Sequence, residues 1–222
     1  MKPALLISRI LFICIIVAGC SSRYISTTWK NDHAFPGNYN KIMIAAIVNT
    51  NDTTYRKDIE NHFKETLQSL GYPSVSSFAE FGTGLRELGQ EETYKKLCER
   101  GVDAVMTVAL IDKTKTGEMS HQAYAEPVKY YYNRMWQYKE QQFEIPALVN
   151  DSTMKYSWEM ILFDLSTLQP HYIEQTKTTD GTIQQSIKDE FWKAMMKRLR
   201  KDRFLKSRQP VTDTTTKGPK AF

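Results

Sequence analysis

The 222-residue sequence has little cysteine and no apolar run long enough to span a bilayer. Three cysteines, at positions 14, 20 and 98, cannot form a disulfide framework, so the fold must rest on a hydrophobic core. The uncharged apolar run over residues 10–19 would measure about 15 Å as a helix, half of the ~30 Å hydrocarbon core. With 41% apolar and 25% charged residues, the composition excludes wholesale disorder and a polytopic membrane protein.

Motifs of known catalytic and metal chemistry are also missing. The four histidines, at 33, 62, 121 and 171, include no pair at helical zinc-site spacing, and there is no HExxH or GxSxG. The glycines of residues 81–89 fit neither GxGxxG nor a phosphate-binding loop. We therefore expect no enzyme activity, no metal and no cofactor. We expect His62 to be a surface or boundary residue and Cys98 to be a small buried side chain.

Residues 1–19 have the layout of a signal peptide. Lys2 and Arg9 precede an apolar run, and small residues lead to Cys20. The segment Val17–Cys20 resembles the lipobox of bacterial lipoproteins, which implies lipidation of Cys20 and cleavage of the leader directly before it. Position 21 is a serine and not the aspartate that retains some lipoproteins at the inner membrane, which favours lipid anchorage to the outer membrane. No acidic cluster of the kind that sends some lipoproteins to the cell surface follows Cys20, so we expect the periplasmic face. Because an exported chain does not meet the chromosome, the net charge of +5 does not indicate nucleic acid.

The mature chain alternates apolar runs with helical periodicity. Apolar strands are predicted over about 41–48, 72–78, 102–111, 153–165 and 171–179. Helices are predicted over about 53–70, 91–100 and 182–203, the first two closed by Gly71 and Gly101. Pro73 suggests an edge strand, and Leu168-Gln169-Pro170 suggests a hairpin turn. We expect a lipidated tether at 20–40, an α/β domain at 41–206 and a disordered tail at 207–222.

Several short segments resemble those of a family of small, uncharacterised bacterial lipoproteins. They are Thr28-Trp29, Lys41–Ile44, Arg56, Leu70-Gly71-Tyr72, Gly101–Val105, Leu110-Ile111-Asp112 and Leu162–Leu165. The resemblance implies an α/β domain similar to that of the curli-secretion lipoprotein, and no established catalytic residue. With the predicted elements, it gives one mixed sheet of about five strands and three packed helices, in β-α-β-α-β-β-β-α order, with an aromatic-rich insertion.

Two stretches favour interaction with a partner. Residues 124–143 hold seven aromatics, and we single out Tyr130, Tyr131, Tyr132, Trp136 and Tyr138 as a partner-binding set. They could equally cover the sheet as part of a hairpin extension. Residues 193–206 are strongly basic, which suits either a solvated helix end or attraction to anionic lipid or an acidic polymer.

These patterns lead to two hypotheses about function. The first is a non-enzymatic, lipid-anchored envelope protein that binds or helps assemble another envelope protein. The alternative is a glycan-binding or glycan-processing periplasmic protein whose aromatics at 124–143 stack on sugar rings. A channel-forming oligomer would need an amphipathic membrane hairpin within 113–150, and the many charges there disfavour it.

Overall fold

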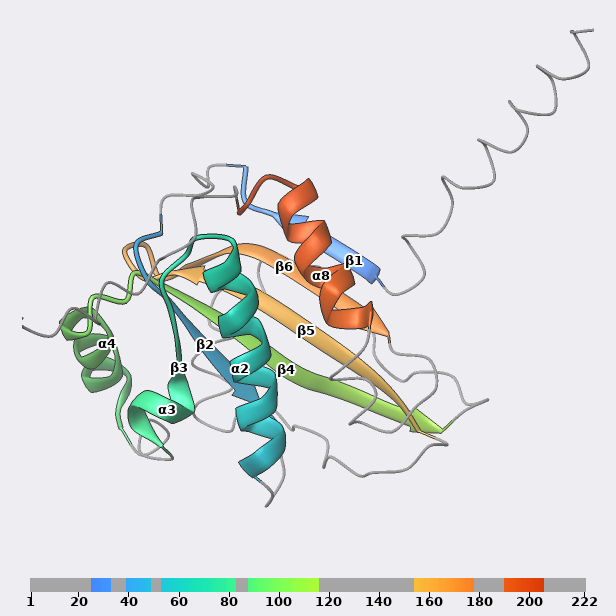
Figure 1. The fold of residues 1–222 in the computed structure, drawn as a ribbon, viewed down its shortest axis with the longest axis horizontal. Helices are drawn as coiled ribbons and strands as arrows, with labels where there is room; N and C mark the ends of the chain where they lie inside the picture. The colour runs from blue at the N-terminus through green and yellow to red at the C-terminus, as the bar shows by residue number, and fades with distance from the viewer. Residues whose placement is uncertain are drawn as a thin grey trace, which may run out of the picture.

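A six-stranded mixed sheet forms the centre of the molecule, which we describe from a computed structural model (Figure 1). The structure describes residues 25–32, 39–48, 53–82, 88–115, 154–177 and 190–205. The strand order is β1-β6-β5-β4-β2-β3. The strands are β1 (Ile25–Lys30), β2 (Ile42–Ile47), β3 (Ser74–Ser76), β4 (Ala104–Lys115), β5 (Met154–Asp164) and β6 (Gln169–Lys177). Helices α2 (Thr53–Ser69), α3 (Ser77–Phe81), α4 (Gln90–Glu99) and α8 (Glu190–Lys201) complete the described elements.

The sheet has a parallel half and an antiparallel half that share β4. Strand β2 pairs in parallel with β3 on one side and with β4 on the other. Strand β5 pairs antiparallel with β4, β6 with β5, and β1 with β6. The α/β class, the single mixed sheet and the order of the predicted elements are therefore confirmed.

The two glycine-terminated helices end as the sequence predicts. Gly71 and Gly101 have φ values of 85° and 68°, a left-handed conformation that costs little without a Cβ atom. In each case the next residue donates back into the last helical turn, from Tyr72 N to Leu67 O and from Val102 N to Leu97 O, both at 3.0 Å. These closures turn the chain directly into β3 and β4.

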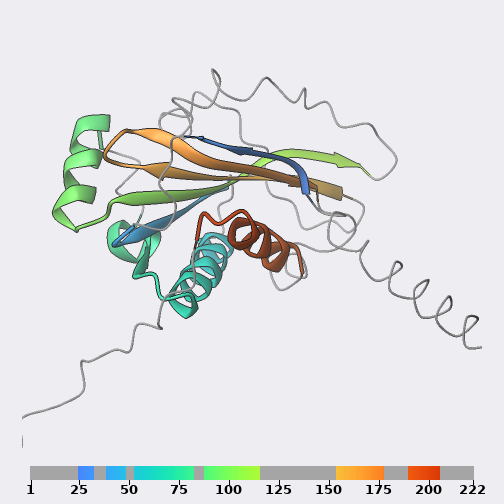
Figure 2. The same cartoon turned by 90° about the horizontal axis from the view of Figure 1, so that it is seen from above.

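Helices cover the two faces of the sheet unequally. Helices α2 and α8 lie side by side on one face (Figure 2), where Phe63 and Trp192 join the largest apolar cluster. Helix α4 packs on the other face, where Leu97 meets Met43 and Val105. Alternate residues of β4 enter the two cores, which explains why its predicted strand is a continuous apolar run.

Three details differ from the sequence interpretation. Residues 25–30, assigned to the tether, form edge strand β1, because a polar alternating segment suffices where one side of a strand pairs with β6. Only Ser74–Ser76 of the predicted strand 72–78 are extended, and α3 follows at once. The hairpin turn occupies residues 165–168, with Leu168 at φ 57°, and Pro170 already belongs to β6.

Candidate functional site

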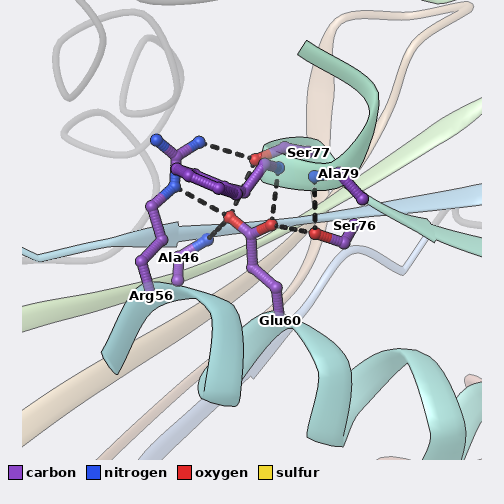
Figure 3. Close-up of polar contacts among 7 residues, drawn as sticks. Ala46, Arg56, Glu60, Ser76, Ser77 and Ala79 are labelled. Atoms are coloured by element: carbon purple, nitrogen blue, oxygen red, sulfur yellow. Dashed lines mark hydrogen bonds and ion pairs between the residues drawn. The ribbon is translucent and has the colours of Figure 1, made fainter. Parts of the chain in front are cut away.

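A buried polar cluster joins the carboxyl ends of β2 and β3 to helix α2. At its centre is Glu60, whose side chain projects from α2 and is fully buried. Ligands of α/β proteins commonly bind at the carboxyl ends of parallel strands, so this edge is the first place to examine for function. Figure 3 shows the cluster.

Five donors surround the Glu60 carboxylate. Oε1 accepts from the backbone N–H of Ala46 at 3.0 Å, from Arg56 Nε at 3.0 Å and from Ser77 Oγ at 2.8 Å. Oε2 accepts from Ser76 Oγ at 2.5 Å and from the backbone N–H of Phe78 at 2.7 Å (Figure 3). The donors come from β2, α2, β3 and α3, so one carboxylate links four successive elements.

Arg56 completes the cluster from the preceding turn of α2. Its Nε pairs with Glu60, and a terminal nitrogen donates to Ser77 Oγ at 2.9 Å. Its guanidinium also lies 5.2 Å from the centre of the Phe78 ring, a cation–π contact. Removing one partner of such a buried pair leaves an uncompensated charge, which typically costs about 3–5 kcal/mol.

A second buried acid lies between the sheet and α8. Glu174 of β6 is fully buried, and its Oε2 accepts from the Tyr172 hydroxyl at 2.9 Å. Among the described residues its other oxygen has no hydrogen-bond partner. Burial raises the pKa of Glu174 to about 8, so the carboxyl is mostly neutral at pH 7.

The same network reaches the surface through Asp202. The Tyr172 hydroxyl lies 3.3 Å from its Oδ2, which also accepts from Arg198 Nε at 3.2 Å. Lys30 Nζ of β1 lies 3.1 Å from Oδ1. Asp202 thus ties the chain just after α8 to the edge strand β1.

A third polar group lies at the turn between β5 and β6. The Tyr39 hydroxyl is 2.7 Å from His171 Nδ1, and both side chains are less than one-tenth exposed. Burial lowers the pKa of His171, and Asp164, 3.9 Å from Nδ1, opposes this shift. Burial also raises the pKa of Tyr39, so both groups are neutral at pH 7.

These geometries favour positioning over chemistry at all three polar groups. Five donors from neighbouring elements already occupy the two carboxylate oxygens of Glu60. Glu174 and the Tyr39–His171 pair likewise face neighbouring elements. Within the described ranges, no group of three or more His, Cys, Asp or Glu side chains could hold a metal ion.

The residues predicted to carry function lie outside the part that the structure describes. Cys20 and the aromatic set Tyr130, Tyr131, Tyr132, Trp136 and Tyr138 belong to residues 1–24 and 116–153. These assignments remain predictions. His62 is half-buried on α2, as expected for a boundary residue. Cys98, expected to be buried, is exposed because it lies on the outer side of α4, next in sequence to buried Leu97.

Sequence reasoning did not find Glu60, Glu174 or the Tyr39–His171 pair. A signal existed for Glu60, because Arg56 and Glu60 are four residues apart and the same series continues with the buried Phe63 and Leu67. Charged residues so placed on a helix indicate a buried pair. Nothing local marks Glu174, because its burial depends on α8 packing over β6.

Comparisons with known proteins give limited similarity. No family model matches the sequence, and no curated protein matches it. Two solved structures of the PelC dodecamer from Paraburkholderia phytofirmans, one of them carrying a single substitution, are 11% and 10% identical, with TM-scores of 0.44 and 0.42. Each alignment covers 82% of this chain and 99% of the other. Lipoprotein GNA1162 from Neisseria meningitidis is 10% identical with a TM-score of 0.37, over 73% of this chain and 94% of that one. At these TM-scores the similarities carry no argument about function.

Replacing Glu60 tests the buried cluster. Glu60→Gln should lower the free energy of unfolding by about 3 kcal/mol, because Arg56 is left buried without its counter-charge. Glu65→Gln, an exposed change on the same helix, should change it by less than about 0.5 kcal/mol. Urea unfolding of both variants measures the difference. Equal effects of the two changes would contradict the role of the cluster.

The raised pKa of Glu174 predicts a pH dependence of stability. In the folded state the proton is held up to about pH 8, whereas an unfolded glutamate loses it near 4.5. The stabilising contribution is therefore complete below the unfolded pKa and is lost as pH rises through the folded one. Between pH 7 and 9 the free energy of unfolding should fall by about 1 kcal/mol.

Glu174→Gln should remove this slope, because the amide does not titrate. His171 contributes nothing to it, since its lowered pKa affects only more acidic solutions. Urea midpoints at pH 7, 8 and 9 provide the measurement, with Glu65→Gln as the matched control. A slope that persists unchanged in Glu174→Gln would disprove the assignment.

Proposed function

We propose that the protein is a lipid-anchored lipoprotein of the cell envelope, not an enzyme, which binds or helps assemble another envelope protein. The observation that carries the proposal is the segment Val17–Cys20, with an apolar leader before it and a small-residue approach to the cysteine. Acyl chains on Cys20 would hold the chain on a membrane, since two or more chains give stable anchoring. Ser21 favours the outer membrane, and the sequence after Cys20, which has no acidic cluster, favours its periplasmic face.

The start of the sheet supports this proposal. Strand β1 begins at Ile25, five positions after Cys20. A fully extended chain of that length reaches at most about 18 Å. A lipid on Cys20 would therefore keep the folded domain directly beside the bilayer. Among the described residues no helix is long and apolar enough to cross a membrane.

The partner surface that we propose is the aromatic stretch 124–143. Tyrosine and tryptophan give large contact areas at low entropic cost, and they dominate the energetics of many protein interfaces. Residues 130–132 are three consecutive tyrosines, and Trp136 and Tyr138 follow within six positions. The alternative occupant is a glycan, since the same side chains stack on sugar rings.

Labelling with radioactive palmitate tests the lipid anchor. The wild-type chain should incorporate label, and Cys20→Ala should not, because the acylated sulfur and the cleavage site are both lost. Cys14→Ala and Cys98→Ala are matched controls, which should keep the label. Label in Cys20→Ala, or a mature chain that begins at Met1, would overturn the proposed anchor.

Crosslinking in whole envelopes followed by purification tests the partner surface. Serine at Tyr130, Tyr131, Tyr132 and Trp136 should remove a crosslinked polypeptide that the wild-type chain retains. Tyr94→Ser, at an exposed tyrosine of α4, is the control and should keep it. If both variants retain the same crosslinked polypeptide, the result would count against this surface. If the aromatic variant instead loses a crosslinked glycan, the result would favour the glycan-binding alternative.

A further inference from the structure

The outer face of helix α8 carries a row of positive charges. Among the side chains of α8 that the structure describes, the exposed ones are Lys193, Lys197, Arg200 and Lys201. At about 100° per residue, these four lie within an arc of about 100°. The buried side chains Trp192, Met195, Met196 and Leu199 occupy the opposite side. We call the four exposed residues the cationic face of α8.

The other long helices of the described fold do not share this pattern. The exposed side chains of α2 carry charges of both signs, as with Lys57, Asp58 and Glu65. Helix α4 likewise combines Glu91 and Glu92 with Lys95. A mixture of this kind suits a helix that faces only water.

The cations of this face have no salt-bridge partner among the described residues. At the C-terminal end of the helix, Asp202 is already bound by Arg198 and by Lys30 of β1. None of the four cations of the face makes a salt bridge within the described part of the chain.

The helix dipole explains only part of this charge. It favours cations in the last turn, where Arg200 and Lys201 lie. It gives little benefit to Lys193 and Lys197, which lie farther from that end. A ligand of negative charge that extends along the helix would account for the whole row.

The position of α8 brings the face near the proposed lipid. Trp192 packs on Trp158 of β5, and Phe204, just after the helix, packs on Tyr172 of β6. Strand β1 is the neighbour of β6, and Lys30 reaches Asp202. In Figures 1 and 2, α8 covers this edge of the sheet.

The chain between Cys20 and β1 is long enough for the lipid of Cys20 and the cationic face of α8 to contact one membrane at the same time. The outer surface of α8 lies roughly 15 Å from the middle of the sheet, given ~10 Å between packed layers and a helix radius of ~5 Å. The extended segment from Cys20 to Ile25 reaches about 18 Å. Acyl chains on Cys20 could therefore enter the same bilayer that α8 touches.

We propose that the cationic face of α8 binds the anionic phospholipid headgroups of the membrane that holds the lipid of Cys20. This proposal rests on the proposed lipid anchor for the location of the membrane, but the binding itself belongs to α8. The contact orients the domain, with α2 and α8 toward the bilayer and the sheet face that carries α4 away from it. Each cation near an anionic surface strengthens binding by roughly five-fold.

The test is lysine acetylation of the purified lipidated chain in vesicles. One set contains phosphatidylcholine alone, and the other contains one part phosphatidylglycerol to two parts phosphatidylcholine. Lys193, Lys197 and Lys201 should react at least five-fold more slowly in the anionic vesicles, whereas exposed Lys95 of α4, on the other face of the sheet, should react equally in both. High salt should abolish the protection, because it screens the charges. Equal reactivity of the α8 lysines in both vesicles overturns the proposal.

A second measurement separates this proposal from the lipid anchor. The full chain with Cys20→Ala should still sediment with anionic vesicles. Adding K193Q/K197Q/R200Q/K201Q should weaken that binding at least ten-fold, and the control set K95Q/K96Q on α4 should change it by less than three-fold. Equal losses in the two sets overturn the role of α8. Failure of palmitate labelling alone would instead remove the anchor and leave the binding by α8 intact.

Discussion

The buried carboxylate of Glu60 is the interaction on which the parallel half of the fold depends. It receives donors from β2, α2, β3 and α3, and Arg56 provides the opposite charge. A charge inside a protein is tolerated only when such partners are in place. The rotation of α2 about its axis and the approach of β3 to the sheet are therefore specified together, because any other arrangement would leave the charge unpaired.

The same constraint extends to the antiparallel half through aromatic packing. With α2 fixed, Phe63 lies 4.9 Å from Trp192 of α8, measured between ring centres, and Trp192 lies 5.3 Å from Trp158 of β5. The ring centres of Tyr172 on β6 and Phe204, just after α8, lie 5.0 Å apart, and this contact holds the end of the helix on the sheet. These contacts determine which side of α8 faces the sheet, and hence that Lys193, Lys197 and Arg200 face outward.

Local sequence patterns predicted most strands of the sheet, but they did not predict its buried polar contacts. Continuous apolar runs identified β2 and β4, and the glycines at 71 and 101 gave the helix ends. Strand β1 was missed because an edge strand needs no apolar run. Glu174 has no local signal, because its burial arises from contacts distant in sequence. The residues with predicted function, Cys20 and the aromatics at 130–138, stay predictions that depend on sequence alone.

A lipid on Cys20 and the cationic face of α8 would act on different degrees of freedom. Acyl chains provide affinity, but a flexible attachment leaves the domain free to rotate over the bilayer. A charged face alone binds more weakly than acyl chains at physiological salt, because charges more than about 8 Å apart are largely screened. Once the lipid confines the domain to within about 18 Å of the surface, that weak attraction acts at high effective concentration. The pairing of the two would convert a tethered domain into an oriented one, with the α4 face of its sheet directed toward other envelope components.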